Sequence, residues 1–202
     1  MADITYWSFD PDGDPTYKKT YVDRLIQIKS QLTHSTKQYS PRYGGISCSA
    51  TMAEGLNCVR FKMNDYTKHP KRWKKVIIPC TDEQEDLMFA FDCRMANVKC
   101  KGSISSPRIW LNDAMDYKGI IDSYTYCGPK AIKYDKIGVV LCNISHRRII
   151  KSWKNRVWCT EQCIMTLLQA FPDLTDKHPD EFRPDNGHKL IESLFVGVNK
   201  RA

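Results

Sequence analysis

The chain has 202 residues, 42% of them hydrophobic, which is typical of a folded domain with a sizeable core and argues against disorder. A net charge of +8, from 31 Lys and Arg against 23 Asp and Glu, favours anionic partners without identifying one. No stretch approaches the roughly 20 apolar residues of a transmembrane helix, and the start lacks a signal-peptide pattern. We therefore expect one soluble, cytoplasmic domain over residues 1–202.

The first half of the chain predicts a helix among antiparallel strands. Residues 4–9 alternate like a half-buried strand, and residues 10–13 have turn chemistry. Asp14 and Pro15 are a plausible start for a helix. Its apolar stripe would consist of Tyr21, Leu25, Ile28 and Leu32. Further strands are expected at 34–39, 45–51, 59–63 and 76–78.

The second half predicts two helices separated by an irregular segment. Thr81 to Gln84 is a capping-box pattern. The helix that it opens would bury one apolar face made of Leu87, Phe91, Met95 and Val98. Residues 101–133 have no clear period, so we expect an irregular insertion or a lid there. Residues 158–171 have helical spacing before Pro172, and the fold class is therefore α+β, with an antiparallel sheet packed against helices.

Cysteine usage bears on both structure and chemistry. Nine cysteines, an odd number, argue against a disulfide framework in a chain without a secretion signal. No Cys-x-x-Cys pair occurs, and although Cys93 with Cys100, or Cys159 with Cys163, could join a scattered metal site, we expect no metal and no cofactor. Cys163 lies on the apolar face of its helix, and we assign it to the core.

Cys159 lies in the first turn of the predicted helix 158–171. Unpaired N–H groups and the positive end of the helix dipole favour a thiolate there, which is the form that attacks carbonyl groups. A lone cysteine in this position is more often a structural residue of the core than a nucleophile.

A catalytic thiol needs a nearby base, and histidine is the usual one at neutral pH. His34 stands at the beginning of a predicted strand, where a rigid element can orient its ring. The other four histidines are less suitable as a base. His146 lies in a basic loop, and three lie in polar stretches that we expect to be exposed: His69, His178 and His188.

The order of these features resembles the permuted papain-like family, which includes NlpC-type permuted amidases, lecithin:retinol acyltransferase-like proteins and proteins of phages and large DNA viruses. Leu32-Thr33-His34-Ser35 is similar to the family's His motif, and Trp158-Cys159-Thr160-Glu161 to its Cys motif. Similar segments between them are Ser47-Cys48-Ser49-Ala50, Val59-Arg60-Phe61-Lys62 and Tyr134-Asp135-x-x-Gly138. The resemblance covers about residues 34–195, without 101–133.

The resemblance implies a cysteine hydrolase or acyltransferase with a Cys159–His34 dyad and a thioester intermediate. The substrate would be a peptide, a ubiquitin-like conjugate or a lipid acyl compound, and the backbone N–H of Cys159 would help to bind the oxyanion. Thr36 stands where many members of the family carry an acid that orients the histidine. Three other residues could take that role: Ser47, Ser49 and Glu54.

Two further functions stay open. One is a catalytically inactive papain-like scaffold that binds viral or host partners. The other is a nucleic-acid-binding protein, because two basic runs lie near Trp73, Trp153 and Trp158. The first run begins at Lys68 and ends at Lys75, and the second begins at Arg147 and ends at Arg156. Each run fits an anion-binding rim or a solvated face.

Overall fold

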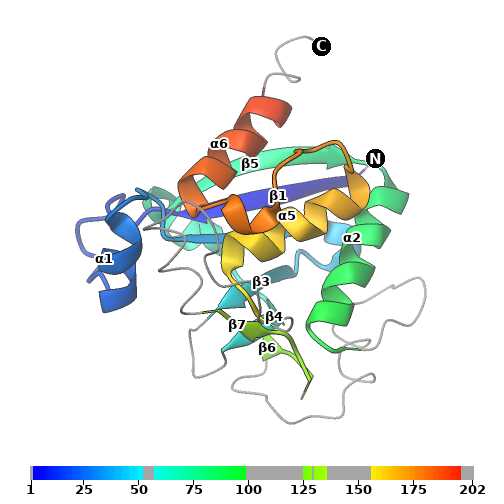
Figure 1. Cartoon of the computed structure of the whole chain (residues 1–202), viewed down its shortest axis with the longest axis horizontal. Helices are drawn as coiled ribbons and strands as arrows, with labels where there is room; N and C mark the ends of the chain where they lie inside the picture. Colours follow the sequence, from blue (N-terminus) through cyan, green and yellow to red (C-terminus); the bar gives the residue numbers. More distant parts are fainter. Residues whose placement is uncertain (1, 52–56, 99–124, 129, 136–155, 197–202) are drawn as a thin grey trace.

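The computed structural model describes residues 2–51, 57–98, 125–128, 130–135 and 156–196 (Figure 1). A curved sheet lies under three helices, and a shorter helix stands at one side (Figure 1). The α+β class is therefore confirmed. The predicted insertion over 101–133 falls largely outside the described residues.

The sheet has eight strands in the described residues, in the order β5-β1-β2-β3-β4-β7-β8, with β6 paired to β4. The predicted strands are all present, and their neighbours pair antiparallel. The β7–β8 pair is parallel, so the sheet is mixed, which corrects the purely antiparallel prediction. The strand bounds are β1 Ala2–Phe9, β2 His34–Gln38, β3 Ser47–Thr51, β4 Cys58–Lys62, β5 Trp73–Cys80, β6 Thr125–Tyr126, β7 Lys133–Tyr134 and β8 Arg156–Val157.

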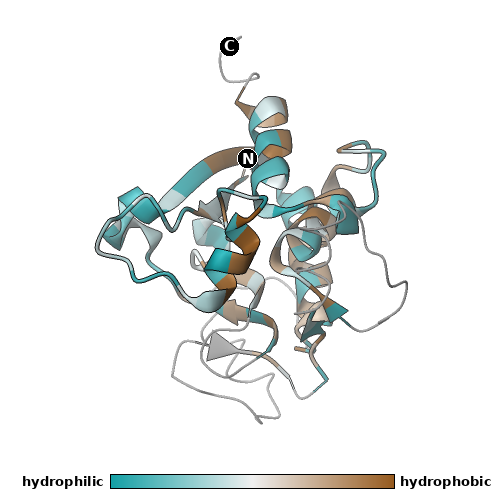
Figure 2. Cartoon of the chain, turned by 60° about the vertical axis from the view of Figure 1, so that its left-hand side comes forward, coloured by the Kyte–Doolittle hydropathy of each residue, from teal (hydrophilic) through white to brown (hydrophobic). Residues whose placement is uncertain are grey.

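Helices α2, α5 and α6 cover one face of the sheet (Figure 1). Helix α6 shows hydrophobic and hydrophilic bands along its length in Figure 2, as an amphipathic helix does. The helix bounds are α1 Tyr21–Gln27, α2 Asp82–Met95, α5 Cys159–Ala170 and α6 Pro184–Phe195. Short 3-10 helices are η1 Pro41–Tyr43, η3 Tyr66–Lys68, η4 Pro70–Arg72 and η5 Pro179–Glu181.

Helix α1 begins later than predicted. Its N-cap is Thr20, whose hydroxyl accepts a hydrogen bond from the Asp23 backbone N–H at 3.1 Å. Asp14 instead binds the Thr16 backbone and forms an ion pair with Arg72 at 2.8 Å. The predicted stripe is wrong in part: Tyr21 is 75% and Ile28 65% exposed, whereas Leu32 is buried beyond the end of the helix, and the buried apolar residue within the helix is Ile26.

The capping box that opens α2 is confirmed, but its predicted apolar face is wrong in part. Thr81 and Gln84 exchange the two expected hydrogen bonds. Leu87 is 55% exposed, whereas Glu85 and Asp92 are fully buried. The face that packs on the sheet is therefore partly polar, which apolar periodicity alone does not reveal.

A buried polar cluster explains this face and connects β2, α2 and α5. The ammonium group of Lys37 lies 2.9 Å from Asp92 Oδ2, and neither side chain is exposed. Tyr39 donates to the same oxygen at 2.6 Å. Gln162 and Thr166 of α5 each donate to Asp92 Oδ1 at 2.6 Å. Helix α5 is thereby fixed over β2.

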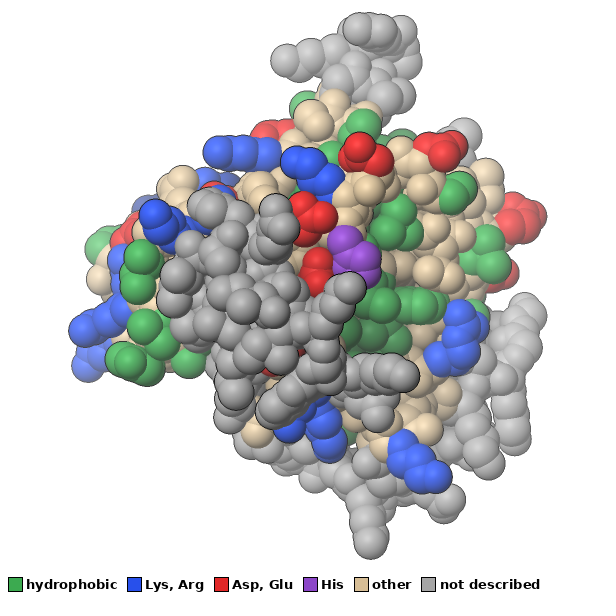
Figure 3. Space-filling model, viewed as in Figure 1, with side chains coloured by type: hydrophobic (Ala, Val, Ile, Leu, Met, Phe, Trp, Pro, Cys, Tyr) green, Lys and Arg blue, Asp and Glu red, His purple; other side chains and the backbone are tan. Residues whose placement is uncertain are grey.

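The surface carries dispersed charge. On the face in Figure 3, Lys and Arg side chains lie in several separate groups, with Asp and Glu among them. Of the two basic runs, the one from Lys68 to Lys75 passes through η4 into β5, and the other lies outside the described residues except Arg156. Trp158 is fully buried, so it is not placed to stack on a base. No described helix is long and apolar enough to cross a membrane.

Candidate functional site

The helix expected to carry the nucleophile forms as predicted. Trp158 is its N-cap, and Cys159 is its first residue. The Trp158 backbone N–H donates to Glu161 Oε2 at 3.3 Å, and its indole N–H donates to the Phe182 carbonyl at 3.1 Å. The start of α5 is therefore stabilised by one hydrogen bond within the helix and by one to the segment that precedes α6.

Cys159 is enclosed at the junction of α5 and β2, with no exposed surface. Its sulfur accepts a hydrogen bond from the Ser35 backbone and lies 3.9 Å from Thr160 Oγ1. Thr160 Oγ1 in turn lies 3.1 Å from Ser35 Oγ. The Tyr134 hydroxyl also forms a hydrogen bond with the sulfur. From the sequence, Tyr134 is identified only as part of a segment similar to the papain-like family, and the contact between Ser35 and the thiol is not predicted.

Burial sets the protonation of this thiol. Loss of solvent raises the pKa of Cys159, and hydrogen bonds from the Ser35 backbone and the Thr160 side chain oppose this increase without offsetting it. The expected preference for a thiolate at the helix start is thus outweighed by desolvation. In the conformation seen here Cys159 is a neutral thiol at neutral pH.

His34 is the first residue of β2 and is half-buried. Its ring lies edge-on to Trp73, with 6.4 Å between the ring centroids. Burial and, to a smaller extent, the positive charge of Arg60 lower the pKa of His34, Asp23 acts in the opposite direction, and the net value is about 4. The imidazole is therefore neutral at pH 7 and can accept a proton.

The backbone of β2 brings these two residues close together. Because the Cys159 sulfur contacts the Ser35 backbone, it lies within roughly 6 Å of the His34 Cα. The two side chains are on different sides of the strand, since Ser35 faces α5 and neighbouring residues of a strand alternate. No hydrogen bond joins Cys159 to His34 in the part of the chain that the structure describes.

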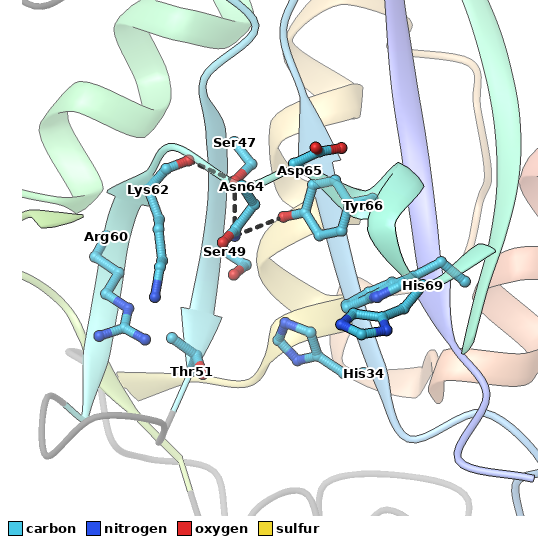
Figure 4. A pocket seen from close by; sticks show the side chains of 11 residues that line it. His34, Ser47, Ser49, Thr51, Arg60, Lys62, Asn64, Asp65, Tyr66 and His69 are labelled. Carbon is cyan, nitrogen blue, oxygen red and sulfur yellow. Dashed lines mark hydrogen bonds between the residues drawn. The ribbon is translucent and has the colours of Figure 1, made fainter. Parts of the chain in front are cut away.

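A pocket of about 300 Å³ opens beside His34 (Figure 4). Two of the candidate orienting residues, Ser47 and Ser49, line it, whereas Thr36 donates to the Cys48 carbonyl at 3.2 Å. Glu54 lies outside the described residues. The other lining residues are Thr51, Arg60, Lys62, Asn64, Asp65, Tyr66, His69 and Trp73. The pocket adjoins the candidate base, and Cys159 is not part of its wall.

The other histidines differ from expectation at one position. His69 and His178 are exposed as predicted, and His146 lies outside the described residues. His188 was expected to be exposed, but it is only 7% exposed, and its Nδ1 lies 3.0 Å from Ser8 Oγ. It lies on the buried face of α6, and the polar residues around it in sequence gave no sign of this.

Cys159 is not the most acidic thiol of the described cysteines. Cys58 and Cys127 lie with their sulfur atoms 3.5 Å apart in a small buried cluster. The hydrogen bond from Cys58 lowers the pKa of Cys127 to about 7, and the charges of Arg60 and Lys133 act in the same direction. Cys163 is fully buried, as predicted for a core residue. No group of three or more potential metal ligands occurs among the described residues.

A comparison of the chain with protein-family models, with curated proteins and with solved structures finds no match in any of the three. Function is therefore inferred from the geometry of the site.

Proposed function

We propose that this protein is a cysteine hydrolase or acyltransferase with a permuted papain-like core, in which Cys159 is the nucleophile and His34 the base. One observation carries the proposal: the Cys159 sulfur contacts the backbone of Ser35, the residue next to His34. A thiol at a helix start and a neutral imidazole at a strand start, far apart in sequence, thus become neighbours. Nucleophilic catalysis needs these two groups in reach of each other.

The proposed reaction begins with a conformational change. Because the two side chains lie on different sides of β2, side-chain rotation alone does not join them, and the reaction requires a backbone movement at the start of β2 that brings the ring of His34 to the thiol. His34 then takes the proton from sulfur, and the sulfur attacks the carbonyl carbon of an amide or ester. The leaving group departs with the proton from His34, which leaves a thioester on Cys159. Water or an acyl acceptor then cleaves the thioester and restores the thiol.

Stabilisation of the developing oxyanion is assigned to the first turn of α5. The backbone N–H groups of Cys159 and Thr160 both lie near the sulfur. N–H groups in the first turn of a helix have no partner within the helix, so they are suited to this role.

The burial of Cys159 favours a second candidate, a scaffold that keeps the arrangement of the elements and binds partners without catalysis. In that case the thiol would remain enclosed and would not become acylated. The experiment below separates the two candidates.

Acylation by p-nitrophenyl acetate, read by peptide mass spectrometry, tests the proposed enzyme. We expect an acetyl group on Cys159 and none there in Cys159→Ala. Removal of the base in His34→Gln should slow acetylation by about 10²- to 10⁴-fold. His69→Gln is the matched control, because His69 lines the same pocket but is not the proposed base.

Because the thiol of Cys127 has a low pKa, it can also react with the ester, and the experiment needs a variant that lacks it. The same series is therefore repeated in Cys127→Ser, so that acetylation of Cys127 does not consume the reagent. If Cys159 stays unmodified, or is acetylated equally fast with and without His34, the enzyme proposal is wrong and the binding scaffold stands.

A further inference from the structure

Two cysteines from distant parts of the chain lie with their sulfur atoms in contact. Cys58 is the first residue of β4, and Cys127 directly follows β6, which pairs with β4. Figure 1 shows β4, β6 and β7 together at the lower end of the sheet. The two sulfur atoms are 3.5 Å apart, and the thiol of Cys58 donates to the sulfur of Cys127. Together with Ala131, the two residues form a small buried cluster apart from the main core.

The backbone holds both thiols in this arrangement. Cys58 lies between β3 and β7 and pairs with both strands. Beyond Cys127, the Gly128 N–H donates to the Ala96 carbonyl at 2.8 Å. A side chain at Gly128 would come within 2.0 Å of the Asn97 carbonyl oxygen, so the backbone approaches closely there and glycine is required. The two cysteines are therefore fixed at both ends of their contact.

The distance between the sulfur atoms suits a disulfide bond. Such a bond needs about 2.05 Å between the atoms, so they must approach by roughly 1.5 Å. Rotation about the side-chain bonds of two facing cysteines covers a distance of this size.

The surroundings favour reaction at Cys127 first. The hydrogen bond from Cys58 lowers the pKa of Cys127, burial opposes this effect, and the positive charges of Arg60 and Lys133 support it. The same contact raises the pKa of Cys58. Since the thiolate is the form that reacts with oxidants, Cys127 is the first site of attack and Cys58 the thiol that follows.

Access to the pair is narrow but open. Cys58 is 3% and Cys127 4% exposed, whereas Cys159 and Cys163 have no exposed surface. Hydrogen peroxide is little larger than water, so an oxidant of this size can reach the pair while larger reagents are hindered.

We propose that Cys58 and Cys127 are a redox-sensitive modification site, at which hydrogen peroxide converts the two thiols into a reversible disulfide. First, the sulfur of Cys127 attacks a peroxide oxygen, the O–O bond breaks, and water leaves with the thiol proton. The sulfur of Cys58 then attacks the resulting sulfenic acid. The S–S bond forms, the S–OH bond breaks, and a second water leaves with the proton of Cys58. Two thiols thereby lose two electrons and two protons to one peroxide.

The disulfide would join β4 to the segment that follows β6. Its two cysteines are 69 positions apart in the chain, so the bond closes a long loop. A cross-link of this kind stabilises the fold chiefly because it restricts the unfolded chain. The site does not involve Cys159, so this inference does not rest on the proposed function.

The test treats the full chain with hydrogen peroxide, blocks the remaining thiols under denaturing conditions, and analyses the unreduced peptides by mass spectrometry. We expect a cross-linked pair of peptides that contains Cys58 and Cys127 and disappears after dithiothreitol. The oxidised chain should unfold at a temperature higher by on the order of 5 °C. In concentrated urea the cross-link should form at least about tenfold more slowly, because the fold no longer holds the thiols together.

Four variants assign the roles. Cys58→Ser should leave a sulfenic acid on Cys127, which dimedone traps, and Cys127→Ser should leave Cys58 reduced. Cys80→Ser is the matched control and should not change the cross-link: Cys80 is as exposed as Cys127, but its sulfur lies 3.5 Å from the Ala2 carbonyl oxygen. Cys159→Ala should also leave the cross-link unchanged.

The inference is wrong if peroxide leaves both thiols reduced, joins Cys127 to a different cysteine, or forms the cross-link as fast in urea as in the folded chain. The wild-type chain alone gives these results, so they do not depend on the folding of a variant. A cross-link without acetylation of Cys159 supports the disulfide and removes the enzyme, and acetylation without a cross-link does the reverse.

Discussion

Cys159 and His34 lie in environments that shift their pKa values in opposite directions and favour the uncharged form of each. Burial raises the pKa of the thiol and lowers the pKa of the imidazole. A thiolate–imidazolium pair is therefore not the resting state of this site. Under the proposed function, solvent or substrate must reach Cys159 before the proton moves.

The low pKa of His34 predicts a pH-dependent stability. Its value is 6.5 when unperturbed and about 4 in the fold, so between these values the unfolded chain binds a proton that the folded chain does not. The contribution is fully present above about pH 6.5 and is lost as the pH falls. From about pH 7.5 to about pH 4.5 the loss should be on the order of 2 to 3 kcal/mol.

Urea unfolding of wild type and His34→Gln at these two pH values measures this contribution. The variant should lose less stability on acidification than the wild type. The exposed His69→Gln serves as control and should behave like the wild type. Equal losses in His34→Gln and the wild type would contradict the assignment.

Elements whose signals are local could be predicted from the sequence, and those that depend on distant partners could not. The capping box of α2 and the extent of α5 were predicted correctly because each is encoded within a few residues. The start of α1 was not, because Asp14 binds Arg72, 58 residues away. Cys159 and His34 were chosen from local position, but their burial and the pocket depend on how the sheet packs.

Gln84 links helices α2 and α5 through two hydrogen bonds, and the contribution of each bond to stability can be measured with a separate variant. Its Oε1 accepts from the Thr81 backbone at 2.9 Å, and its Nε2 donates to the Ala170 carbonyl at the end of α5 at 3.1 Å. Thr81→Ala should cost about 1 kcal/mol through the cap alone. Gln84→Glu keeps the acceptor but loses the donor, which should cost about 0.5 to 1.5 kcal/mol.

Chemical denaturation of the two single variants and the double variant tests this separation. Thr81 and Gln84 exchange hydrogen bonds, so the double variant measures how strongly the two losses are coupled. If Gln84→Glu is as stable as the wild type, the contact with α5 contributes nothing.

At the scale of the whole molecule, the cluster around Asp92 joins the sheet to two helices. Asp92→Asn leaves the Lys37 ammonium without its counter-charge in the core and should destabilise the fold by about 3 to 5 kcal/mol. Asp86→Asn on the same helix is the matched control: its carboxylate is half exposed in its ion pair with Arg42, so the loss should be below about 1 kcal/mol. If the two variants unfold at similar urea concentrations, the buried Lys37–Asp92 ion pair does not contribute strongly to the stability of the fold.

The order of the strands leaves one long edge of the sheet uncovered by any other described strand. Strand β5 pairs with β1 along its length, and its other side has no partner among the described strands. Such an edge can recruit a strand from a second copy and seed aggregation. Ile77 on this strand is 42% exposed, which adds to that tendency, while exposed Lys75 sets like charges against each other when two copies approach. We therefore expect the basic run that ends at Lys75 to oppose self-association, and neutralisation of its lysines to favour it.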